Sequence, residues 1–137
     1  MTIFERVQKL NLPEGQYVVS GSGILSALGI RESHDVDILV SPELFRELKE
    51  KRGWNKHEKY PDTCITSPDN STEAIEMMVR TKEKYILKDL LPNSIIIEKI
   101  PFLSLEQLID IKKQLGREKD LADIARIKDY LAQIAKK

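Results

Sequence analysis

The segment YVVSGSGILSALGIRESHDVDILV, residues 17–40, decides the fold that we expect. It starts with an apolar run at 17–19, continues through small residues at 20–23 and a helix-like stretch at 24–28, and returns to an apolar run at 35–40. β-Branched and aromatic residues favour strands, whereas Gly and Ser interrupt them. The segment therefore predicts a strand, a tight turn, a short helix and a second strand.

The small residues at 20–23, SGSG, are typical of a turn that binds an anion. Glycine lets the backbone approach a bulky anion, and the start of the following helix presents unpaired N–H groups and the positive end of the helix dipole. Gly21 and Ser22 are therefore candidates for binding phosphate, and a triphosphate would suit this turn. An alternative role for Ser22 is that of a helix N-cap alone.

Two aspartates, Asp35 and Asp37, lie in the second predicted strand. Side chains alternate along a strand, so these two carboxylates share one face. Carboxylates are ionised at neutral pH and repel each other, and a divalent cation with oxygen ligands relieves that repulsion. We therefore expect a metal site. The alternative is a solvated Asp-x-Asp pair on an edge strand with no ligand.

Gly21 and Ser22, the twelve residues 23–34 and the pair Asp35-x-Asp37 resemble the signature of the nucleotidyltransferase superfamily, which includes DNA polymerase β and the small antibiotic nucleotidyltransferases. The resemblance implies an α/β nucleotidyltransferase fold, in which a small mixed β-sheet carries packed helices. It also implies that the Gly-Ser turn holds the phosphates of a nucleoside triphosphate. The two aspartates and a third acidic residue on a later strand would bind two Mg²⁺ ions, or Mn²⁺ in their place.

The third acidic residue is expected in residues 73–80, EAIEMMVR. Alternation in this strand places Glu76 among apolar neighbours. A glutamate inside such a strand is costly unless it is paired or bound to a metal, so Glu76 is the candidate. The family more often has aspartate at this position. Glu73, next to the preceding loop, is the alternative.

Residues 105–130, LEQLIDIKKQLGREKDLADIARIKDY, resemble a recurring tail of small bacterial nucleotidyltransferase-like proteins, including toxin-type members of abortive-infection systems. In that tail, basic groups return toward the active site. The matching residues are Lys112, Gly116, Arg117, Lys119, Asp120 and Asp123. The resemblance implies phosphate contacts from Lys112, Arg117 and Lys119, and Arg31 is a further candidate beside the acidic pair. Pairing of these cations with aspartates or with helix dipoles is an equal alternative.

Capping patterns predict the remaining helices. Capping boxes occur at 2–5 and 104–107, and an N-cap serine with a first-turn proline occurs at 41–42. We expect helices to start at about residues 2, 42, 105 and 119, and Gly53 to end the second of them. We also expect a strand at 95–100, ended by Pro101, and one or two short strands within 54–67. The chain reads as a single domain, 1–137, with a core at about 14–100 and a C-terminal helical hairpin at about 104–136.

Composition narrows the functional class. The chain has 22 Lys and Arg residues and 22 Asp and Glu residues, so its net charge is zero. This balance argues against a generally basic nucleic-acid-binding protein. A nucleic-acid or protein partner is possible but has no support in the sequence. One cysteine and two histidines argue against a disulfide framework and against a zinc site. No apolar segment approaches membrane-spanning length, so we expect a cytoplasmic protein without a membrane partner.

These patterns and resemblances together predict a metal-dependent nucleotidyltransferase. It would transfer a nucleoside monophosphate from a nucleoside triphosphate, such as ATP, to a hydroxyl of an unknown acceptor and release pyrophosphate. The alternative is a catalytically silent module with the same fold, which binds nucleotide or acts as one partner of a toxin–antitoxin pair.

Overall fold

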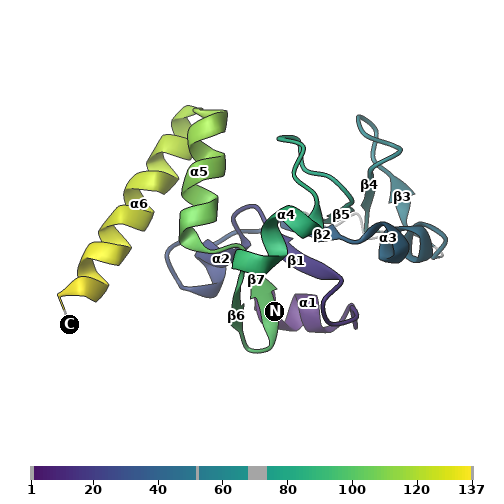
Figure 1. The fold of residues 1–137 in the computed structure, drawn as a ribbon, viewed down its shortest axis with the longest axis horizontal. Helices are drawn as coiled ribbons and strands as arrows, with labels where there is room; N and C mark the ends of the chain where they lie inside the picture. The colour runs from purple at the N-terminus through teal and green to yellow at the C-terminus, as the bar shows by residue number, and fades with distance from the viewer. Residues whose placement is uncertain (1, 52, 68–73, 137) are drawn as a thin grey trace.

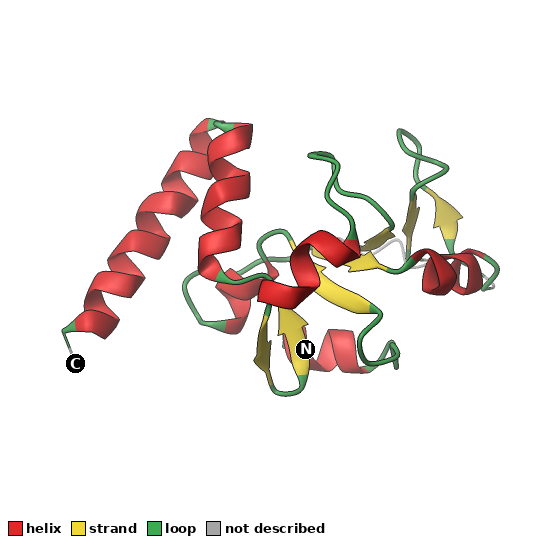
Figure 2. Cartoon of the chain, viewed as in Figure 1, coloured by secondary structure: helices red, strands yellow, loops and turns green. Residues whose placement is uncertain are grey.

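The computed structural model describes residues 2–51, 53–67 and 74–136 and has a mixed α/β fold (Figures 1 and 2). Within these ranges one seven-stranded sheet has the order β3-β4-β5-β2-β1-β7-β6. Its strands are β1 (Tyr17–Ser20), β2 (Val36–Val40), β3 (Asn55–Lys56), β4 (Cys64–Thr66), β5 (Ile75–Met78), β6 (Ile95–Ile97) and β7 (Ile100–Phe102). The pairs β2–β5 and β1–β7 are parallel and the others are antiparallel, so the predicted mixed sheet is confirmed.

Helices cover both faces of the sheet. They are α1 (Ile3–Gln8), α2 (Gly23–Ala27), α3 (Pro42–Lys49), α4 (Leu87–Leu90), α5 (Leu105–Leu115) and α6 (Glu118–Ala135), with a 3₁₀ turn η1 (Leu91–Asn93). The last two form a hairpin beside the sheet, and α6 runs outward to the C-terminus (Figure 1). None of the helices in the described ranges is both long enough and apolar enough to span a membrane.

The helix starts follow the capping patterns. The hydroxyl of Thr2 accepts a hydrogen bond from the backbone N–H of Glu5, and Ser41 and Ser104 cap α3 and α5 in the same way. Gly116, in the left-handed region with φ +62°, ends α5. These local signals suffice because each one satisfies backbone groups that a helix end leaves unpaired.

Two predicted boundaries were wrong. Residues 95–100 do not form one strand but a hairpin, in which β6 and β7 are joined by Glu98 and Lys99 with φ of +49° and +68°. A two-residue turn with positive φ usually contains Asn or Gly, so this Glu-Lys turn has no sequence signal. Pro101, expected to end a strand, lies inside β7. Helix α3 ends at Lys49, before Gly53.

Each face of the sheet packs on its own apolar cluster. The larger cluster joins one face to α1, α2, α3 and parts of α5 and α6. The smaller cluster lies on the other face and consists of Val18, Leu39, Leu87, Leu90, Leu103 and Ile111. Along this second face the strands change from apolar to polar toward one end, and that end carries the candidate site.

Candidate functional site

A row of polar side chains crosses four neighbouring strands. Asp37 of β2 is paired with Ser20 of β1 and with Glu76 of β5, and Glu76 is paired with Thr66 of β4. Residues paired across strands project from the same face, so the two carboxylates lie side by side. Glu76, rather than a residue further along the chain, is therefore the acidic neighbour of Asp37. The alternative, Glu73, lies outside the described residues.

A cavity of about 790 Å³ opens over this polar row. Every candidate site residue from the sequence lines it: Gly21, Ser22, Arg31, Asp35, Asp37, Glu76, Lys112, Arg117 and Lys119. The acidic members come from β2, β5 and the residue before β2, whereas most of the basic members come from the α5–α6 hairpin. The cavity thus has an acidic floor and a basic wall.

Negative charge is crowded on the floor. Burial, reinforced by the charges of Glu76 and Asp35, raises the pKa of Asp37 to about 6, and the nearby cation of Lys82 partly opposes this rise. Asp35 is exposed and directly precedes β2. Carboxylate oxygens are the ligands that Mg²⁺ prefers, so this set of residues fits a divalent cation whose charge would relieve the repulsion.

The Gly-Ser turn lies against the same floor. Gly21 has φ +59°, and a Cβ atom at this position would lie 2.8 Å from Oδ2 of Asp37. The following helix α2 has only five residues, too few for a large dipole, so positive charge near the turn must come from side chains. The turn therefore places backbone groups beside the acidic residues without a long helix behind it.

Arg31 connects the turn to the C-terminal hairpin. Its Nε and Nη2 atoms donate to Oδ1 and Oδ2 of Asp123, each at 2.7 Å, and Nη2 also donates to the hydroxyl of Ser22 at 3.1 Å. Ser22 occupies the N-cap position of α2, as its alternative role predicted, but its side chain makes no capping hydrogen bond there. The bidentate pair fixes the guanidinium plane at the edge of the cavity.

Two buried aspartates of α6 organise the basic wall. Lys112 Nζ lies 2.9 Å from Asp123 and 3.5 Å from Asp120, and Arg117 pairs with Asp120 at 2.7 Å. Arg31 and Arg126 also pair with Asp123, so four cations surround two carboxylates and positive charge is in excess. Burial alone would raise the pKa of Asp123, but hydrogen bonds from Arg31 and Lys112 lower it well below its ordinary value.

Lys112 and Arg117 therefore pair with aspartates and also line the cavity. Lys119 lines the cavity, is exposed, and makes no ion pair with a described residue. Lys82, in the loop after β5, also lines the cavity, and its charge acts on Asp37. Nothing in the sequence singles out Lys82, because a lysine in the polar stretch TKEK carries no local signal that separates it from a solvated surface residue.

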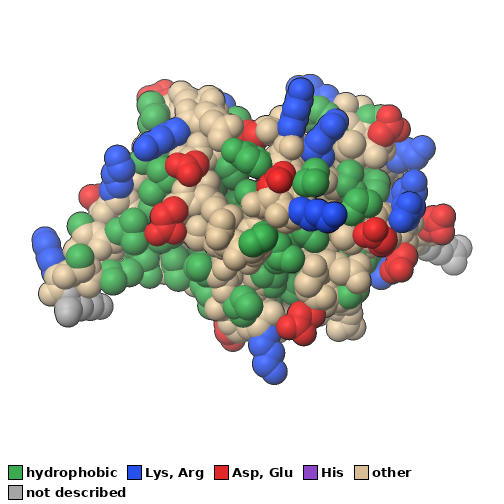
Figure 3. All heavy atoms as spheres, in the orientation of Figure 1, with side chains coloured by type: hydrophobic (Ala, Val, Ile, Leu, Met, Phe, Trp, Pro, Cys, Tyr) green, Lys and Arg blue, Asp and Glu red, His purple; other side chains and the backbone are tan. Residues whose placement is uncertain are grey.

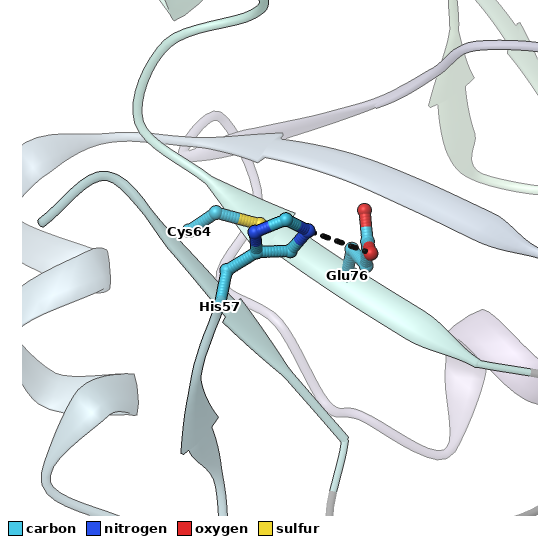
Figure 4. Close-up of side chains that lie close together, drawn as sticks. All are labelled: His57, Cys64 and Glu76. Carbon is cyan, nitrogen blue, oxygen red and sulfur yellow. Dashed lines mark ion pairs between the residues drawn. The ribbon is translucent and has the colours of Figure 1, made fainter. Parts of the chain in front are cut away.

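His57, Cys64 and Glu76 form a second group that sequence reasoning missed (Figure 4). One ligand atom of each lies within 4.8 Å of the others, and His57 Nε2 lies 3.5 Å from Oε1 of Glu76. Among the described residues, this is the one group of at least three potential metal-ligand side chains whose ligand atoms all lie within 4.8 Å of one another. Asp35 and Asp37 line the large cavity together with Glu76, but the three carboxylates are not gathered that closely.

The hydrogen bonds of His57 argue against a metal in this second group. Its Nδ1 atom accepts backbone N–H groups from Lys59 at 3.0 Å and Tyr60 at 3.2 Å. The neutral ring therefore carries its proton on Nε2, the atom that faces Glu76, and has no lone pair there for a metal. Burial raises the pKa of the Cys64 thiol to about 12, which disfavours the thiolate that a metal requires.

Comparison of the chain with protein-family models, with curated proteins and with solved structures finds no match.

Proposed function

We propose that the protein is a metal-dependent nucleotidyltransferase, which transfers a nucleoside monophosphate from a nucleoside triphosphate to a hydroxyl acceptor and releases pyrophosphate. The observation that carries the proposal is the single cavity in which the acidic residues of β2 and β5 face the cations of the α5–α6 hairpin across the Gly-Ser turn. A triphosphate needs both halves of such a cavity, because it binds a divalent cation and remains strongly negative.

The acidic floor is the place for the metal. Asp35, Asp37 and Glu76 supply carboxylate oxygens from one end of the sheet. Mg²⁺ bound there would neutralise charge on the phosphates and lower the pKa of the attacking hydroxyl. Strand pairing fixes Asp37 beside Glu76, and positioning together with electrostatic stabilisation is most of what phosphoryl-type transfer requires from a protein.

The basic wall is the place for the phosphates. Lys119 is exposed at the cavity and makes no ion pair with a described residue, so it reaches anionic oxygens without losing a partner. Arg117 is also exposed there while its Nε and Nη2 atoms stay on the buried Asp120. Arg31 is held by Asp123 and Ser22, so it presents a fixed guanidinium edge to the turn. A volume of about 790 Å³ falls in the range of small-molecule sites, roughly 300–1,000 Å³, and suits a nucleotide.

Pyrophosphate release tests the proposal. The protein is incubated with Mg²⁺, each labelled nucleoside triphosphate and a cell extract as the source of acceptor, and both pyrophosphate and labelled product are measured. We expect Asp35→Asn and Asp37→Asn to reduce turnover at least about 100-fold, because each removes a metal ligand. Asp129→Asn, at an exposed position of α6, is the matched control and retains turnover. Unchanged turnover in both active-site variants would refute the metal role.

A catalytically silent nucleotide-binding module is the second candidate. It is favoured by the arrangement of Glu76, which lies in the tight group with His57 and Cys64 rather than in one with Asp35 and Asp37. Calorimetry separates the two functions. Binding of a nucleoside triphosphate with Mg²⁺ but without pyrophosphate release, in the presence of extract, identifies the module.

A further inference from the structure

A second cavity, of about 270 Å³, adjoins the first and shares Glu76, Met78, Thr81 and Lys82 with it. We propose that this second cavity binds the acceptor, and that the acceptor is a small hydroxyl compound bearing an anionic group, a phosphate or a carboxylate. The proposal rests on the nucleotidyl transfer proposed above and names the class of its unknown substrate.

Glu76 stands between the two cavities. Asp37 lines the first and Cys64 lines the second, and both lie close enough to Glu76 to feel its charge. An acceptor in the second cavity and a nucleotide in the first would therefore meet at this carboxylate. That is the arrangement required for a hydroxyl to attack a phosphorus atom held on the other side.

The charges of the second cavity select an anion. Its described lining residues include three cations, Arg80, Lys82 and Lys84, and one acidic residue, Glu76. None of the three cations makes an ion pair with a described residue, so each is available to an anionic ligand. In the space-filling view, Lys and Arg side chains stand out over the loop that precedes α4 (Figure 3).

Two rings, those of His57 and Tyr60, also line the second cavity. The ring centroids of His57 and Tyr60 lie 5.4 Å apart. Hydrogen bonds from two backbone N–H groups to Nδ1 hold the His57 ring in place. A volume of about 270 Å³ lies just below the usual range of ligand sites, roughly 300–1,000 Å³, so a compound of pentose size is favoured over a large one. A sugar phosphate or a sugar acid has the size, the hydroxyl groups and the charge.

The transfer step balances with these groups. The acceptor hydroxyl oxygen forms a bond to the α-phosphorus of the nucleoside triphosphate. The bond from that phosphorus to the oxygen bridging the β-phosphate breaks, and its electron pair leaves with pyrophosphate. The hydroxyl proton is released to water.

The test uses three probes that differ in charge: ribose 5-phosphate, ribonate and ribose. The full chain is first saturated with Mg²⁺ and a nucleoside triphosphate analogue that cannot be cleaved between the α- and β-phosphates, so that the first cavity is filled. Each probe is then titrated while NMR shifts of the His57 and Tyr60 rings are followed. The double variant Arg80→Gln with Lys84→Gln removes two cations that line the second cavity alone.

We expect ribose 5-phosphate, ribonate or both to bind at least about tenfold more tightly than ribose. The anion that binds more tightly shows whether the site prefers a phosphate or a carboxylate. The double variant should lose this preference and keep its affinity for the nucleotide analogue. Lys88→Gln, at an exposed position of α4 that lines neither cavity, should behave as the wild type.

Equal binding of the three probes, binding of none of them, or an undiminished preference in the double variant would overturn the acceptor proposal. Failure of the wild type to bind the nucleotide analogue would instead overturn the proposed nucleotidyl transfer. Intact analogue binding in the double variant shows that it is folded, so its loss of anion preference is not a loss of structure.

Discussion

Gly21 lies directly against the carboxylate of Asp37, because a Cβ atom at position 21 would come within 2.8 Å of Oδ2. The contact is with an oxygen of a strand residue whose backbone is fixed by pairing on both sides. The side chain of Asp37 must therefore turn away if residue 21 acquires a methyl group. The Gly-Ser turn and the acidic floor are thus one unit.

We predict that Gly21→Ala weakens Mg²⁺ binding by displacing Asp37. The variant also loses roughly 1 kcal/mol of stability, because φ of +59° is unfavourable for alanine. Gly29→Ala is the matched control, since Gly29 has φ +72° but no atom within 4 Å of its added Cβ. Calorimetric titration with Mg²⁺ and thermal melts separate the two effects. Equal Mg²⁺ affinities in the two variants would contradict the prediction.

The metal-free protein should be destabilised as the pH rises through the range in which Asp37 ionises. Its pKa is raised from 3.8 to about 6 in the folded state, so between these values the folded state binds more protons than the unfolded state. Linkage then makes the free energy of unfolding fall with rising pH over this window, by up to about 3 kcal/mol in total.

Asp37→Asn should therefore be more stable than the wild type above pH 6 and similar to it below pH 4. Urea denaturation in the presence of EDTA measures the difference. Asp35→Asn, at an exposed position, should show a smaller gain. A gain for Asp37→Asn that is independent of pH would show that ionisation is not its cause.

Asp123→Asn should be strongly destabilising. The substitution leaves Arg31 and Lys112 beside a neutral side chain in a buried site, and breaking a buried ion pair in this way costs about 3–5 kcal/mol. Because the pKa of Asp123 is lowered, its contribution is present above its ordinary value of 3.8 and is lost as the pH falls below it. Urea denaturation at pH 7 measures the cost, with Asp129→Asn as the exposed control on the same helix. Equal stability of the two variants would mean that the cluster is not coupled to folding.

Cobalt should not form a thiolate complex at the His57–Cys64–Glu76 group at neutral pH. Both the proton on Nε2 of His57 and the raised pKa of the Cys64 thiol oppose it. Absorbance titration with Co²⁺ checks for the sulfur-to-cobalt charge-transfer band. A band that appears in the wild type and is lost in Cys64→Ser would establish a metal site instead.

Local sequence signals predicted much of the framework. The capping residues Thr2, Ser41 and Ser104 start helices as expected, because each interacts with backbone groups only three residues away. The alternation in β5 also placed Glu76 correctly on the face of the sheet opposite Met77. Such information is contained in a few consecutive residues.

The remaining features depend on which strands become neighbours. His57 approaches Glu76 because β4 lies between β3 and β5, and no pattern within residues 54–67 specifies that order. Lys82 and Arg80 reach a cavity only through the path of the loop that follows β5. Their roles could be proposed only once the sheet order was known.

The hairpin of β3 and β4 occupies one edge of the sheet and is attached to the rest of it through β5. Grafting a different hairpin at this position would replace His57 and Cys64, which belong to it, whereas Asp37 and Glu76 lie on the neighbouring strands β2 and β5. The architecture is in that sense modular: the outer hairpin can be exchanged without touching the strands that carry the two paired carboxylates, which offers a route to variants with a differently lined second cavity.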